Sequence, residues 1–289
     1  MVLESVINPF VLKKKPWEMF IAGFMYSLIA LFLSYFVFRE GAGLLMVFLI
    51  VLSTLPTLYV TIKNEEELDL KYDKEVVLLK EHTKVLIYLI MLFLGITVAL
   101  ALAYVFLPTN VIDSVFVLQK QAITNVVQSV NQNAVELTGD IIRVDLFGKI
   151  FLNNLKVLFF CLIFSFLYGT GAIFILTWNA SVIASAIGNL AKGEIANTAA
   201  SVGFTSIGAY FSIATFSFLR YMTHGLLEIA SYFIAGLAGG IISIALIKHN
   251  LKEDKVLIDA LDLILISIVV LFFAGIVEVF VTPVLFVSR

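Results

Sequence analysis

The chain has 289 residues, of which 61% are hydrophobic and 14% charged, and its formal net charge is −2. These are too few polar side chains to cover the surface of a soluble globular protein of this size. The composition therefore predicts an all-α, polytopic membrane protein surrounded by a lipid bilayer. No lysine or arginine cluster interleaved with aromatic residues lies outside the apolar segments, which argues against a nucleic-acid partner. The single cysteine, Cys161, excludes an intramolecular disulfide and a cysteine-based metal site.

Seven apolar segments are candidate membrane spans, because most of them contain the roughly 20 residues that cross a bilayer core. They cover residues 18–38, 41–62, 83–107, 149–178, 202–219, 222–247 and 256–282. The fifth is short and rich in serine, threonine and glycine, so it stays open whether residues 202–219 cross fully. A shorter apolar stretch at 179–190 is interpreted as an interfacial or half-crossing helix.

These spans divide the chain into three predicted parts. Residues 1–107 form a membrane region of three spans with a short cytoplasmic helix at 64–80, which Asn64 begins as N-cap. Residues 108–146 are rich in glutamine and asparagine and carry apolar residues at helical spacing, so they predict an extracytoplasmic helical segment on the bilayer or against a partner. Residues 147–289 form a membrane domain of about four spans.

The lysines predict the orientation in the cell membrane. If the N-terminus is cytoplasmic, seven crossings place Lys13, Lys14 and Lys15, the lysines of 63–80, Lys192 and the lysines of 248–255 inside. This asymmetry follows the positive-inside rule and favours seven spans over six. At the membrane borders, His82 and His249 are expected to be solvated.

Ionisable residues inside the spans mark the candidate site, because an unpaired charge in hydrocarbon is costly. Arg220, His224 and Glu228 are spaced i, i+4, i+8 and therefore share one helix face. Counting 1.5 Å per residue from the predicted span ends places two further polar positions at the same outer depth. The sequence thus predicts one buried polar cluster, with Arg220 at its rim: Asn153 or Asn154, His224, Glu228 and Glu278.

Glycines in two spans are interpreted as helix-packing positions. Gly169 and Gly171 flank Thr170 and allow close approach or a kink, and Gly236 and Gly240 form a small-xxx-small pair. The contact of the second pair can lie within the monomer or across a homodimer, and the sequence leaves both open.

Three interpretations of the polar cluster are carried forward. It fixes helix register, it conducts an ion or proton, or Glu228 and His224 act as an acid/base pair in an intramembrane hydrolase. The sequence contains no H-E-x-x-H, no G-x-S-x-G and no G-x-x-x-x-G-K-[ST]. We therefore predict no catalytic residue, no metal site and no cofactor.

Several motifs together resemble the stage II sporulation protein M family of membrane proteins. They are Asn153-Asn154 at the start of a span, His224-Gly225-Leu226-Leu227-Glu228, and Glu278 followed by Thr282-Pro283. Asn8-Pro9 and Lys15-Pro16-Trp17-Glu18 resemble the archaeal members. The resemblance implies an all-helical membrane protein, and in endospore-forming bacteria an anchor for a complex with peptidoglycan-degrading partners that is not itself the hydrolase.

The leading hypothesis is therefore a membrane scaffold or complex subunit without catalytic activity. Its protein partners would bind the outer segment 108–146 and the cytoplasmic loop 64–80. The alternative is an ion or small-solute channel or transporter in which the His/Glu cluster lines a polar path.

Overall fold

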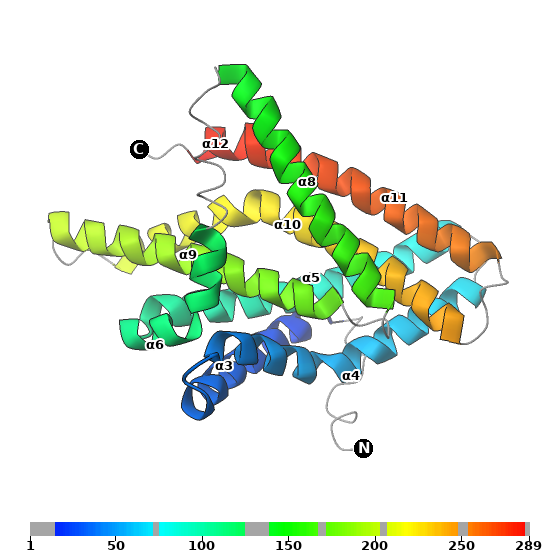
Figure 1. Ribbon diagram of the computed structural model, residues 1–289, viewed down its shortest axis with the longest axis horizontal. Helices are drawn as coiled ribbons and strands as arrows, with labels where there is room; N and C mark the ends of the chain where they lie inside the picture. Colours follow the sequence, from blue (N-terminus) through cyan, green and yellow to red (C-terminus); the bar gives the residue numbers. More distant parts are fainter. Residues whose placement is uncertain are drawn as a thin grey trace.

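The computed structural model describes residues 15–71, 75–124, 139–166, 172–202, 207–247 and 254–286. Within these ranges every regular element is a helix, and seven helices are long and apolar enough to cross a membrane (Figure 1). The prediction of an all-α bundle with seven spans is confirmed. In chain order the elements are α3 Trp17–Val37, α4 Ala42–Lys71, α5 Glu75–Phe106, α6 Thr109–Val115, α8 Gly139–Phe166, α9 Ala172–Val202, α10 Ile207–Ile247, α11 Asp254–Ile276, η1 Val277–Val281 and α12 Thr282–Leu285.

Most of the long helices run side by side along the long axis of the molecule, whereas α8 crosses them obliquely (Figure 1). We call the end that carries α6, the end of α9 and the start of α10 the α6 end; α4 and α10 finish at the opposite end. Helix α10 is the most buried span, because 83% of its most apolar stretch lies inside the protein. The corresponding share for α8, the least buried span, is 11%. The bundle is therefore built around α10, and α8 lies at its surface.

Two glycines bring α3 and α5 into backbone contact. A Cβ atom on Gly95 would lie 2.1 Å from the carbonyl oxygen of Phe20, and one on Gly23 would lie 2.5 Å from that of Leu92. Only glycine fits at such distances, and small residues are the usual means of close helix packing in membranes. The reciprocal pair fixes the register of α3 on α5.

Three of the predicted segment boundaries are wrong. The segment 149–178 is two helices, because α8 ends at Phe166 and α9 begins at Ala172. The stretch 179–190 is the middle of α9 and not an interfacial helix. Segments 202–219 and 222–247 form one helix, α10, which runs unbroken through Arg220 for 41 residues. The predicted total of seven is still correct, since one segment divides and two merge.

The two polar segments also differ from expectation. Asn64 lies inside α4, which continues to Lys71, and α5 begins at Glu75, so no separate helix starts at Asn64. The first part of the outer segment packs into the protein: Ile112, Val115 and Phe116 are buried, and the Gln119 amide donates a 3.2 Å hydrogen bond to Ser181 Oγ. Its last residues belong to α8, and 125–138 lie outside the described residues.

A histidine at the opposite end is buried, against the expectation that it is solvated. The His82 side chain, on α5, is 1% exposed, and its Nε2 lies 3.0 Å from Asp259 Oδ2 on α11. Their 177-residue separation in sequence hid the pairing. His249 lies outside the described residues.

Replacing Gly95 with alanine is expected to lower the free energy of unfolding by about 1–3 kcal/mol, since the added methyl group displaces the α3 backbone. Gly193→Ala is the matched control, because a Cβ atom there meets nothing within 4 Å. In a helix interior that exchange should raise stability by up to ~1 kcal/mol. Thermal unfolding of the purified protein in detergent measures both, and equal melting temperatures would contradict the packing.

Candidate functional site

Polar side chains from α8, α10 and the last turns of the chain meet inside the bundle. Asn154 comes from α8, His224 and Glu228 from α10, Glu278 from η1, and Thr282 begins α12. His224 and Glu228 lie one turn apart on the same face of α10, so one helix presents both to its neighbours. We call these five residues the polar cluster.

The strongest contact in the polar cluster joins α8 to α10. The Asn154 amide donates a 2.7 Å hydrogen bond from Nδ2 to Oε1 of Glu228. The carboxyl group of Glu228 also lies within hydrogen-bonding range of Glu278.

The backbone at Glu278 departs from the α-helix. η1 is a π-helix, in which Thr282 donates from its amide and, at 3.0 Å, from its hydroxyl to the carbonyl of Val277. We attribute the wide turn to Pro283, which has no N–H for the carbonyl four residues before it. The Thr282 hydroxyl is thus left to accept, and His224 Nδ1 lies 3.2 Å from it and donates. This bond ties α12 to α10.

Aromatic residues lie on the helices that carry the polar cluster. Tyr232, one turn beyond Glu228, is 2% exposed and lies close to both glutamates and to Cys161. Between α8 and α11, three rings pack with centroids 5.4 to 5.9 Å apart: Phe147, Phe151 and Phe272. One oxygen of Glu278, Oε2, is buried with no hydrogen-bond partner among the described residues.

The structure places the remaining predicted residues elsewhere. Asn153 is exposed on the opposite face of α8, because neighbouring residues on a helix point about 100° apart. Arg220 is half-exposed and forms no hydrogen bond or ion pair with the described residues. The polar cluster therefore takes Asn154, not Asn153, and Arg220 lies one turn before His224 on α10 without a bond to the cluster.

The glycine pair of α10 is buried within the chain. A Cβ on Gly236 would lie 3.0 Å from that of Ala172 on α9, and Gly240 is also buried. The closest approach is at Gly239, where a Cβ would lie 2.7 Å from the carbonyl of Leu162 on α8. Gly169 and Gly171 lie outside the described residues.

Two members of the site were missed from the sequence. Thr282 and Tyr232 are unremarkable residue types in membrane helices, and neither is charged. The signal for Thr282 was Pro283, which disturbs the preceding turn at the position of a buried carboxylate. Tyr232 follows Glu228 at i+4, which places it on the same helix face.

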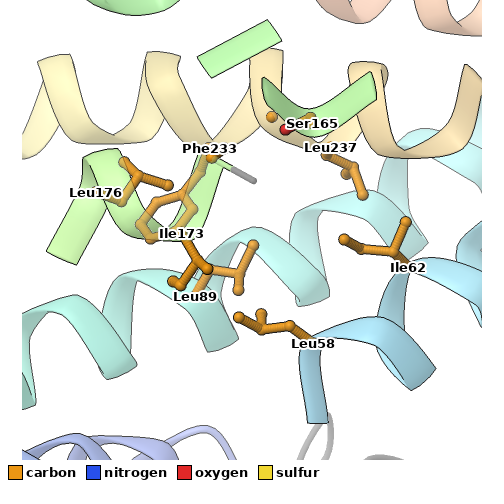
Figure 2. Close-up of a pocket in the computed structure, with 10 residues that line it drawn as sticks. Leu58, Ile62, Leu89, Ser165, Ile173, Leu176, Phe233 and Leu237 are labelled. Atoms are coloured by element: carbon orange, nitrogen blue, oxygen red, sulfur yellow. The ribbon is translucent and has the colours of Figure 1, made fainter. Parts of the chain in front are cut away.

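Four cavities bounded by described residues are lined almost entirely by apolar side chains, and none of the four reaches the polar cluster. The most enclosed, of about 30 Å³, lies among α4, α5, α8, α9 and α10, and its one polar side chain is Ser165 (Figure 2). Within the described ranges no three histidine, cysteine, aspartate or glutamate side chains meet as metal ligands.

Residues 84–283 match the family model described as Stage II sporulation protein M. The matched region runs from α5 to α12 and contains every residue of the polar cluster. It begins well before Asn153-Asn154, the first of the C-terminal family motifs, and does not include the N-terminal motifs Asn8-Pro9 and Lys15-Pro16-Trp17-Glu18. Comparison with curated proteins and with solved structures gives no match.

The adjacent asparagines provide a test of the geometry. Asn154→Leu should lower the free energy of unfolding by about 1–2 kcal/mol, because it leaves the Glu228 carboxyl group without its amide donor. Asn153→Leu should leave stability unchanged or raise it, since that side chain is exposed on an apolar surface. Unfolding of both variants in detergent micelles checks this difference, and the reverse order of stability would contradict the assignment of Asn154 to the cluster.

Proposed function

This chain belongs to the stage II sporulation protein M family, and we propose that it is a membrane scaffold or complex subunit without catalytic activity of its own. The observation that carries the proposal is that hydrogen bonds within the polar cluster join α8 to α10 and α12 to α10. Asn154 donates a hydrogen bond to Glu228, and His224 donates one to Thr282. Glu228 also lies beside Glu278. Groups that are used to join helices are not presented to a substrate or to a permeating ion.

The described cavities do not open onto the polar cluster, and this supports the same function. An acid/base pair needs a reacting atom within about 3 Å of both groups, and a conducting path needs continuous polar lining. The four described cavities are apolar and lie away from Glu228 and His224. A scaffold needs neither feature, because its task is to hold a fixed surface for partners.

We propose the cell membrane as its location, with the N-terminus in the cytoplasm. The revised helix boundaries move Lys192 to the outer side, where its Nζ lies 3.3 Å from the carbonyl of Leu107. The lysines at 13–15, at 63–80 and at 248–255 stay on the N-terminal side, so the positive-inside rule still favours this orientation.

A proteoliposome flux assay tests the proposal against the channel alternative. Native protein is expected to give no more proton or alkali-cation flux than protein-free vesicles between about pH 5 and pH 8, since none of the four described cavities reaches the cluster. Glu228→Gln, which keeps the size of the side chain, should behave identically. Robust flux that depends on pH and disappears in Glu228→Gln would overturn the scaffold function.

A further inference from the structure

Helix α8 presents a continuous face that no other part of the described chain covers. Its exposed residues are Lys149, Leu152, Asn153, Lys156, Phe159, Phe160 and Ile163, and we call them the α8 face. At about 100° per residue they fall within an arc of roughly 120–160°. The residues that pack into the bundle, including Asn154, Leu158 and Cys161, occupy the opposite arc.

Lys156 lies near the middle of the α8 face, one turn from Asn153. Both side chains are exposed, and neither forms a hydrogen bond or ion pair with the described residues. Lys149, at the upper edge of the same face, already pairs with Asp145 at 2.5 Å. In a helix that spans a membrane, an uncompensated ammonium group among phenylalanines is costly.

Gly148 adds an independent feature beside the α8 face. At Gly23, Gly43 and Gly95 an added Cβ would lie 2.1 to 2.5 Å from the nearest atom of a neighbouring helix, whereas Gly193 of α9 is open like Gly148. A Cβ on Gly148 meets nothing within 4 Å. Gly148 and Leu152 are spaced i, i+4, so the glycine leaves room for a second backbone beside this face.

We propose that the α8 face binds a membrane-spanning helix of another protein, which carries a carboxylate opposite Lys156 and a polar group opposite Asn153. Charge complementarity defines this partner, because an ammonium group in hydrocarbon is best stabilised by a carboxylate. The flanking rings of Phe159 and Phe160, 55% and 50% exposed, supply apolar contact area. The proposal rests on the scaffold function and names the surface through which it acts.

A second copy of this chain does not offer the required carboxylate. Copies related by an axis along the membrane normal meet at equal depth, and Lys156 lies about 3 Å along α8 from Asn154, at the depth of the polar cluster. Glu228 and Glu278 at that depth are used within the cluster. Asp262 is exposed on α11, but it lies about 24 Å from Glu278 along the helix axis.

A lipid phosphate fits the pattern less well than a helix. Asn153 and Lys156 lie about 6 and 10 Å further along α8 than Lys149. The lysine stem can extend toward a headgroup, but the short asparagine side chain cannot. A partner helix reaches both residues.

Model peptides in phosphatidylcholine vesicles test the proposal. The probe is a labelled leucine-alanine helix of about 23 residues with one central aspartate, compared with the same helix carrying leucine or lysine there. Energy transfer to the labelled full-length protein reports binding. We expect the aspartate peptide to bind about tenfold more tightly than either other peptide.

The variants make the result specific. Lys156→Leu should remove the preference for aspartate, whereas Lys156→Arg should keep it, and both should melt like the native protein because the side chain is exposed. Lys149→Leu is the control that should retain the preference, since that lysine pairs with Asp145.

Three outcomes would overturn the proposal. In the first, the three peptides bind equally. In the second, added phosphatidylglycerol displaces the aspartate peptide and binds in a Lys156-dependent way, which assigns the face to lipid. In the third, self-association of the protein blocks the peptide, which assigns the face to a second copy. None of these affects the flux assay, so the scaffold function can stand when the α8 face fails. Flux through the native protein would reject the scaffold function itself.

Discussion

A carboxyl group inside a bilayer must be neutral or partnered, and this requirement organises the C-terminal half of the molecule. Glu228 on α10 meets this requirement because it accepts a hydrogen bond from the Asn154 amide on α8. It also lies beside Glu278 on η1. Three elements that are distant in sequence are thereby held at one depth. The bond is of most consequence for α8, which is the least buried span, with 11% of its most apolar stretch inside the protein.

The two halves of the bundle use different means of association. In the first half, Gly23 and Gly95 let α3 and α5 touch through their backbones. In the second half, three contacts hold α8 against α10. They are the hydrogen bond from Asn154 to Glu228, the close approach at Gly239, and a 2.8 Å hydrogen bond from Ser243 Oγ to the carbonyl of Phe166. These contacts use the inner side of α8 and leave its outer face exposed.

The sequence predicted the fold class, the number of spans and most of the polar cluster, because apolar runs and buried charges are strong local signals. The predictions were wrong where one local sequence feature is compatible with two different structures. Arg220 was interpreted as a boundary, yet α10 passes through it as one helix. Residues 149–178 were predicted as one span because their composition is apolar throughout, whereas they belong to two helices, α8 and α9. Asn153 and Asn154 could not be separated, since only the packing of α8 decides which one faces α10.

A double-mutant cycle on Asn154 and Glu228 measures the central interaction most directly. Unfolding free energies would be determined for the native protein, Asn154→Leu, Glu228→Leu and the double variant. Direct bonding predicts a coupling energy of about 0.6–1.7 kcal/mol, so the double variant loses less stability than the two single variants together. Additive losses would show that the two side chains do not hold α8 on α10, and would contradict this account.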